Sequence, residues 1–291
     1  MAVEFKKVRK PGRKLRKLLK RMGARPTPEQ VHDFRTNSRK LEANLEAFGM
    51  DGSRLGKRVL KPLSRFRKRA GKIRDMDVLT SYAASIQPQD GEKDCAVQLL
   101  EYLGAKRRRH AKKFYGASRQ NGPVLIKRLK KLERELAKSE AHIENGGSPE
   151  SMASSMALQL GSRLASGARL NHSNLHPFRL KVKELRNVLR LAGDPDQNLL
   201  DALGSVKDVI GEWHDWEELV GIAEKTLDHG TQCKLTQTLK ATTQKKFDNA
   251  LSEAEQLRKR YLGLSDKKRP PRSQSAEPPE PLLRAAMKLA A

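Results

Sequence analysis

The chain has 291 residues and carries 60 Lys and Arg against 34 Asp and Glu, a formal net charge of +26. A chain of this length buries one large hydrophobic core or two modest ones. Its charge favours polyanionic partners, namely nucleic acid, anionic membrane surfaces or polyphosphate. We expect neither a membrane-spanning helix nor a signal peptide, because no stretch of 18 apolar residues occurs and no apolar run follows the basic N-terminus.

Cys95 and Cys233 form no CxxC pair and have no metal-ligand spacing. We expect both to be small apolar thiols of a protein in a reducing compartment, the cytoplasm.

Apolar periodicity predicts helices throughout and no β-strand. A basic helix is expected before residue 21, interrupted at Pro11 and Gly12, and Thr27 is expected to cap the next one, which ends near Gly49. The remaining helices of this half are expected at about 53–70, 72–86, 93–115 and 123–144. A linker at 144–149 then precedes further helices, which are expected at about 150–170, 175–193 and 232–262. Between the last two, a helix is expected to carry the apolar residues of 199–210, and the segment 211–219 follows it. Residues 265–291 are rich in Pro, Ser and charge and are expected to be disordered, with LLRAAMKLAA as a frayed tail or a helix that weakly contacts a partner or a membrane.

Two stretches of the chain repeat each other. Residues 31–49 read VHDFRTNSRKLEANLEAFG and residues 175–193 read LHPFRLKVKELRNVLRLAG. They align without a gap, and identical residues meet at His32/His176, Phe34/Phe178, Arg35/Arg179, Leu41/Leu185, Leu45/Leu189 and Gly49/Gly193. On a helix, the His, the Arg three residues later and the base seven residues later fall within about 60° of one another, opposite the apolar residues. Each stretch therefore predicts a helix with one apolar and one basic face.

The repeat continues into the following helix at an offset of 140 residues. GKIRDMDVL at 71–79 matches GEWHDWEEL at 211–219, and the apolar residues before them also correspond. We therefore predict an all-α protein in which an internal duplication gives two four-helix-type bundles related by a pseudo-twofold axis. The folded domain is expected over residues 1–264, with halves at about 5–145 and 149–262.

The basic faces of the two copies are the candidate binding site, because like charges that face each other across a groove need an anion between them. Arg offers a planar fork to phosphate oxygens, Lys offers a point charge, and His donates one hydrogen bond when neutral. The candidate residues of the first half are His32, Arg35, Arg39, Lys40, Arg67 and Arg74. Those of the second half are His176, Arg179, Lys183, Arg186 and Lys207. The ends of the groove are assigned to Arg13, Arg16, Lys20, Arg107, Arg108 and Arg109.

Simpler interpretations stay open. A basic face opposite an apolar one is what any solvated amphipathic helix shows, and the two histidines also suit helix-start hydrogen bonding. Metal binding at these histidines is disfavoured, because neither has a second ligand at helical spacing. Trp213 is expected in the core, His214 beside it carries no separate assignment, and Asp75 and Asp215 are expected to be N-caps or partners of a nearby Arg.

The motifs VH-x-F-R-(x)3-R-K-L, G-x-x-R-D-x-D-x-L and LH-x-F-R-(x)3-K-x-L-R resemble those of the CHAD family, the conserved histidine α-helical domain. The resemblance covers about residues 5–262. It implies two four-helix bundles, a basic cavity that binds inorganic polyphosphate and, in some members, association with polyphosphate granules. The sequence departs from the family pattern at Glu42 and Glu184, where a base is usual, and at His214, where Asn is common.

The leading hypothesis is a polyphosphate-binding protein without catalytic residues, metal or cofactor. A nucleic-acid-binding protein is the alternative, although the predicted basic faces carry no aromatic side chains for base stacking. An enzyme that acts on polyphosphate is the third hypothesis, and it requires acidic metal ligands near the basic residues.

Overall fold

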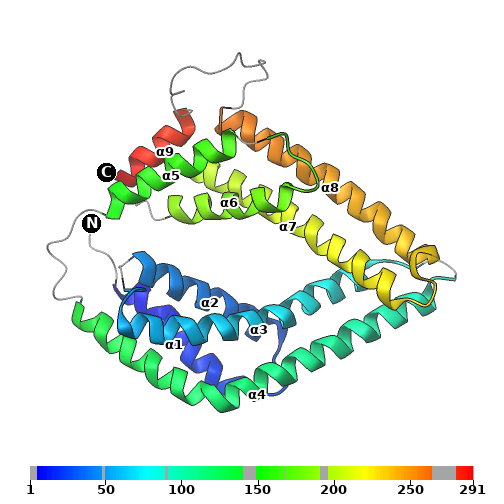
Figure 1. Ribbon diagram of the computed structural model, residues 1–291, viewed down its shortest axis with the longest axis horizontal. Helices are drawn as coiled ribbons and strands as arrows, with labels where there is room; N and C mark the ends of the chain where they lie inside the picture. The colour runs from blue at the N-terminus through cyan, green and yellow to red at the C-terminus, as the bar shows by residue number, and fades with distance from the viewer. Residues whose placement is uncertain are drawn as a thin grey trace. The chain divides into compact units, whose positions relative to one another are not determined.

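The computed structural model describes residues 5–47, 50–88, 91–139, 149–166, 168–190, 196–263 and 280–290. Within these residues the chain is all helical and has no strand, as predicted. It divides into two compact units, Met1–Gly146 and Gly147–Ala291. Figure 1 shows the helices of each unit along the chain.

In its described residues, the first unit is a bundle of four helices. They are α1 (Phe5–Arg21), α2 (Pro28–Ala47), α3 (Arg54–Ser85) and α4 (Lys93–Ser139). Each helix packs against the next, and α1 also packs against α4 (Figure 1). The predicted apolar face of α2 is buried at Phe34, Leu41 and Leu45, and the rings of Phe34, Phe66 and Phe114 meet edge to face at the centre of the core.

The start of α2 follows the predicted capping pattern. Thr27 Oγ1 accepts a hydrogen bond of 3.3 Å from the backbone N–H of Gln30, and Gln30 Oε1 accepts one of 3.1 Å from the backbone N–H of Thr27. Both contacts satisfy N–H groups that a helix leaves without partners at its first turn. The prediction that Thr27 caps this helix is confirmed.

Three of the predicted helix breaks are wrong. The first helix continues through Pro11 and Gly12, α3 continues through Gly71, and α4 continues through Pro123. In α4 the buried residues Phe114, Leu125 and Leu129 stay in phase across the expected break. Packing of a continuous apolar face stabilises a helix more than one Gly or Pro destabilises it locally, so these breakers do not interrupt it.

The second unit contains α5 (Pro149–Ala165), α6 (Leu175–Leu189), α7 (Gln197–Thr226), a 3₁₀ turn η1 (Gly230–Gln232), α8 (Lys234–Tyr261) and α9 (Glu280–Ala290). The predicted apolar face of α6 is buried at Phe178, Val182 and Leu185. Trp213 lies in the core as predicted, packed against Phe247 and His172. Cys95 and Cys233 are both buried, as expected of small apolar residues.

The expectation of a frayed C-terminal tail is wrong for residues 280–290. These residues form α9, which packs mainly against α5 and buries Leu282 and Ala285 in the core (Figure 1). Residues 264–279, on which the rest of the disorder prediction falls, lie outside the described residues, and so does most of the predicted linker at 144–149. None of the described helices is both long and apolar enough to cross a membrane.

Candidate anion-binding faces

In the first unit, α2 places Arg35 against α3 at Gly71. Arg35 Nη1 lies 2.7 Å from the position that a Cβ atom would take on Gly71, and 3.6 Å from Asp75 Oδ1. Only a residue without a side chain lets the guanidinium lie this close to the helix. Asp75 is therefore the partner of an Arg, one of its two predicted roles, and its position inside α3 excludes the other role of N-cap.

The other candidates on α2 lie nearer to solvent. His32, Arg39 and Lys40 are exposed, and His32 Nε2 lies 3.4 Å from Thr36 Oγ1. Arg74 of α3 is half-buried, and its charge helps to lower the pKa of Glu29, after the larger effect of hydrogen bonds to that carboxylate at the start of α2.

Arg67 is compensated inside the first unit. Its guanidinium holds the Glu42 carboxylate with two hydrogen bonds, one of which joins Nη2 to Oε1 at 3.0 Å. Glu42 is one of the three residues at which the sequence departs from the family pattern, and its carboxylate pairs with a base of the neighbouring helix. Arg67 therefore contributes less to an anion site than the sequence alone indicated.

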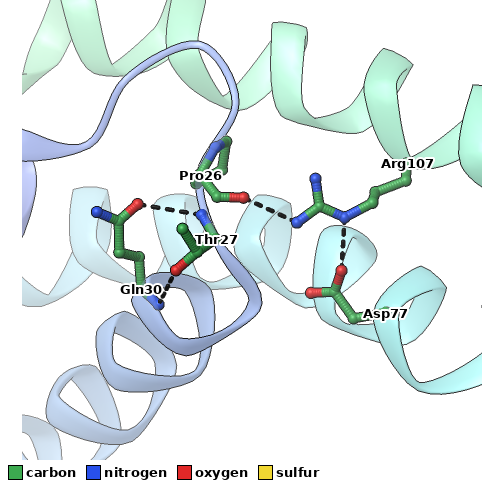
Figure 2. A network of polar contacts seen from close by, with 5 residues as sticks. All are labelled: Pro26, Thr27, Gln30, Asp77 and Arg107. Atoms are coloured by element: carbon green, nitrogen blue, oxygen red, sulfur yellow. Dashed lines mark hydrogen bonds and ion pairs between the residues drawn. The ribbon is translucent and has the colours of Figure 1, made fainter. Parts of the chain in front are cut away.

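Arg107 has a structural role that the sequence did not indicate. Figure 2 shows its guanidinium between two elements: Nε donates to Asp77 Oδ1 of α3 at 2.5 Å, and Nη2 donates to the Pro26 carbonyl at 2.8 Å. This network ties α4 to α3 and to the segment that caps α2. Arg108 and Arg109, predicted with it, are exposed.

Of the three candidate bases on α1, two contact an acid of another helix and one is exposed. Arg16 Nη1 lies 3.2 Å from Glu133 Oε2 of α4, and Arg13 Nε lies 4.0 Å from the same oxygen. Burial raises the pKa of Glu133, against the opposing effect of Arg16, Arg13 and Arg9. Lys20 is exposed. Arg13 and Arg16 therefore serve the α1–α4 contact.

In the second unit, two arginines of α6 lie against glycines of α7. Arg179 Nε donates to the Lys207 carbonyl at 2.9 Å, and its Nη2 lies 2.7 Å from the position of a Cβ on Gly211. Arg186 Nε donates to the Leu200 carbonyl at 3.0 Å, beside Gly204. In both arginines, the Nε hydrogen bond to a backbone carbonyl of α7 fixes the orientation of the guanidinium. Lys183 is half-buried, and Lys207 Nζ forms an ion pair with the adjacent Asp208.

A histidine cluster surrounds His176. Its ring centroid lies 4.3 Å from that of His214, and its Nδ1 is buried without a hydrogen bond. Glu217 completes the cluster: its Oε1 lies 2.8 Å from His172 Nε2, and its Oε2 lies 3.4 Å from His214 Nδ1. Sequence reasoning gave neither His172 nor His214 a role. The available signal for His214 was the alignment of the two halves, which places it opposite Arg74, a candidate binding residue.

Arg35 and Arg179 thus occupy closely similar positions, one in each unit: each guanidinium lies against a glycine of the neighbouring helix, and we call this position its seat. The sequence prediction did not include Gly71 and Gly211 among the functional positions. The signal that could have identified them is that a glycine begins both of the motifs that match at an offset of 140 residues. Among the described residues, no group of three or more His, Cys, Asp or Glu is arranged to hold a metal ion.

The comparison with protein families decides the relationship. The model of the CHAD domain matches residues 12–224, which include the helices α2, α3 and α6 and all but the last two residues of α7.

The chain belongs to the CHAD family.

The fold agrees with this assignment. The crystal structure of the CHAD domain from the plant Ricinus communis matches with a TM-score of 0.51 and 18% sequence identity, covering 89% of this chain and 84% of that one. At this identity the likeness concerns the fold alone. A comparison with curated proteins found no match.

The His176 cluster predicts a pH-dependent stability for this CHAD protein. Burial, then the nearby His214 and Arg179, lower the pKa of His176, while Glu217 opposes them. The unfolded chain therefore takes up a proton at a higher pH than the folded one, so folding stability is full above about pH 6.5 and falls as the pH decreases. We expect the melting temperature of the second unit to drop between about pH 7.5 and 5.

Tryptophan fluorescence measures this transition, because both tryptophans of the chain, Trp213 and Trp216, lie on α7. The His176→Gln variant is expected to show a smaller drop than the wild type. An equal drop in both proteins would contradict the role of His176.

Proposed function

We propose that this protein binds inorganic polyphosphate through the basic faces of α2 and α6, without chemistry. These faces carry His32, Arg35 and Arg39 in the first unit and His176, Arg179 and Lys183 in the second. Binding proceeds by charge neutralisation and release of counterions along a linear chain of phosphates. Membership of the CHAD family, with the family's basic motif residues present in both copies, supports this proposal.

The observation that carries the proposal is the seating of Arg35 and Arg179 against glycines. A guanidinium held against a helix has lost much of its side-chain entropy before the ligand arrives, so less is lost on binding. Arg179 also uses Nε for the Lys207 carbonyl, which leaves its Nη groups to meet phosphate oxygens in a fixed orientation. A surface base kept only for solubility needs no such seat.

A competition titration at about 150 mM salt tests the proposal. Long-chain polyphosphate, single-stranded DNA and duplex DNA are matched by phosphate concentration. We expect polyphosphate to bind at least tenfold more tightly than either DNA. We expect a face variant, Arg35→Ala, Arg39→Ala, Arg179→Ala and Lys183→Ala, to lose this preference, because each charged hydrogen bond contributes roughly 1.5–3 kcal/mol.

A matched control removes the same charges elsewhere. The substitutions Arg21→Ala, Arg54→Ala, Arg163→Ala and Lys225→Ala remove three arginines and one lysine, two bases from each unit, and all four side chains are exposed. If polyphosphate binding weakens equally in the face variant and in the control, the effect depends on net charge alone and not on the basic faces. Turnover of polyphosphate on addition of Mg²⁺ or Mn²⁺ would overturn the non-catalytic proposal in favour of an enzyme.

A further inference from the structure

The positive charge of the chain is concentrated in one unit. Residues 1–146 contain 38 Lys and Arg against 16 Asp and Glu, whereas residues 147–291 contain 22 against 18. The two units share the His-and-Arg faces of the proposed polyphosphate site, so that site does not account for the difference. The excess of positive charge in the first unit therefore indicates a basic surface that the second unit lacks.

Two acid-free runs lie next to each other in the first unit. Residues 52–74 contain ten Lys and Arg and residues 102–132 contain eleven, and neither run has an Asp or Glu. The first run lies mostly on α3 and the second on α4, which pack against each other as an antiparallel pair (Figure 1). At 1.5 Å per residue the runs extend about 35 Å and 45 Å along the pair.

Bases from both helices meet where α3 and α4 adjoin. We call Arg65, Arg69, Lys72, Lys106, Arg109 and Lys113 the basic seam. The three on each helix fall within about 60° of one another at helical spacing. The charge of Lys72 on α3 acts on His110 of α4: the pKa of His110 is lowered by burial first, then by Lys72, Lys106, Lys113 and Arg109. Further along the pair, Arg128 of α4 donates to the Arg58 carbonyl of α3 at 3.0 Å.

No acid in the described part of the chain neutralises the basic seam. None of its six bases forms an ion pair there, and all are exposed or half-exposed. Three acids at or near the ends of the runs are engaged elsewhere: Asp75 with Arg35, Asp77 with Arg107, and Glu133 with Arg16. Repulsion among the seam bases is therefore uncompensated until a polyanion binds.

We propose that the basic seam binds duplex nucleic acid by phosphate contacts, independently of sequence. Neighbouring helices lie about 8–10 Å apart, so the seam presents two parallel rows of bases at that spacing. Two phosphate backbones border each groove of a duplex, at about 6 Å across the minor groove and about 12 Å across the major groove. The seam bases span about 10 Å of each helix, and the basic run on α3 that contains three of them extends about 35 Å, which matches one helical turn of DNA. A single phosphate chain such as polyphosphate has only one backbone, so it cannot contact the α3 row and the α4 row of bases in the way that the two backbones of a duplex can.

Single-stranded nucleic acid fits the seam less well, because its binders stack bases on aromatic side chains. The exposed aromatic nearest to the seam in sequence is Tyr102, and Lys106 Nζ lies 5.4 Å from the centre of its ring. Its face is thereby engaged in a cation–π contact.

The test is fluorescence anisotropy of the full chain with a labelled 20-base-pair duplex, over a salt series that starts at about 50 mM. The seam variant carries Arg69→Gln, Lys72→Gln, Lys106→Gln and Lys113→Gln. The matched control carries Arg21→Gln, Lys10→Gln, Lys14→Gln and Lys17→Gln on α1, which are also one exposed arginine and three exposed lysines of the same unit. We expect the seam variant to lose at least tenfold in affinity and to reduce the magnitude of the salt slope by about 2–4. The control is expected to lose less than threefold.

Further arms separate this proposal from the polyphosphate one. The seam variant is expected to keep its polyphosphate affinity within threefold, and the face variant is expected to keep its duplex affinity within threefold. Equal losses of duplex binding in the seam and control variants would overturn the proposal. So would equal binding of a 20-base single strand, or seam-dependent binding of phosphatidylserine vesicles with no binding of duplex. Loss of polyphosphate binding in the seam variant would show a general polyanion surface and would overturn its assignment to duplex.

Discussion

Replacing Gly211 with alanine is expected to weaken polyphosphate binding about tenfold or more while the second unit stays folded. A Cβ atom on Gly211 would stand 2.7 Å from Arg179 Nη2 and 3.0 Å from its Nε. The atoms in conflict belong to the end of a flexible side chain, so the guanidinium moves and the helix does not. Arg179 then loses its hydrogen bond to the Lys207 carbonyl and its fixed orientation toward phosphate.

Stability and binding should respond differently to this change. Alanine in a helix interior is favoured over glycine by roughly 0.8–1.0 kcal/mol, whereas the lost hydrogen bond has a charged donor and costs about 1.5–3 kcal/mol. The two partly cancel, so tryptophan fluorescence should detect a loss of only about 0.5–2 kcal/mol in the stability of the second unit, which stays folded. A charged hydrogen bond to phosphate contributes roughly 1.5–3 kcal/mol, so its loss weakens binding by tenfold to about a hundredfold. Titration with long-chain polyphosphate measures this effect.

Gly221 provides the matched control on the same helix. No atom outside its own helix turn lies within 4 Å of the position of its Cβ, so Gly221→Ala should stabilise α7 slightly and leave binding unchanged. Gly71→Ala is the counterpart in the first unit, where the Cβ would stand 2.7 Å from Arg35 Nη1. If Gly211→Ala binds polyphosphate as the wild type does, the seat of Arg179 is a packing feature and does not serve binding.

These glycines also show what the sequence predicts and what it does not. The helices that carry the basic faces were predictable, because Phe34, Leu41 and Leu45 on α2, like Phe178 and Val182 on α6, recur at helical spacing and are buried. Gly71 was interpreted as a helix stop, since glycine is the usual local signal for one. Its actual reason is the close approach of Arg35 from another helix, and local sequence contains no trace of that contact.

The charge partners were unpredictable for a similar reason. Glu42 meets Arg67 and Asp77 meets Arg107 across 25 and 30 residues of chain. Composition shows an excess of bases, but only the packing of the helices decides which bases the few acids neutralise. The sequence therefore named the candidate bases, and the structure distinguishes Arg35 and Arg179, which are seated beside glycines, from Arg13, Arg16, Arg67 and Arg107, which mainly hold helices together.

The C-terminal helix gives the second large expected effect. Leu282→Ala should destabilise the second unit by about 2–5 kcal/mol, the range for truncating a fully buried leucine. Leu282 has no exposed surface, and its Cδ2 lies 2.0 Å from the position that a Cβ on Gly161 of α5 would take. The α9 side chain thus fills a notch that glycine leaves in α5. Loss of the side chain opens a cavity in a part of the core that Ala157, Leu160 and Leu164 line.

Leu283 is the control for this change, since it is the next residue on the same helix and is 37% exposed. Leu283→Ala should shift stability by well under 1 kcal/mol, because the substitution leaves no cavity. Chemical denaturation followed by the fluorescence of Trp213 and Trp216 reports on the second unit without interference from the first, which contains no tryptophan. If α9 were a frayed tail, both variants would unfold at the wild-type midpoint. A shift with Leu282→Ala alone requires that the helix be part of the bundle in solution, although the basic, Pro-rich sequence before it predicts disorder.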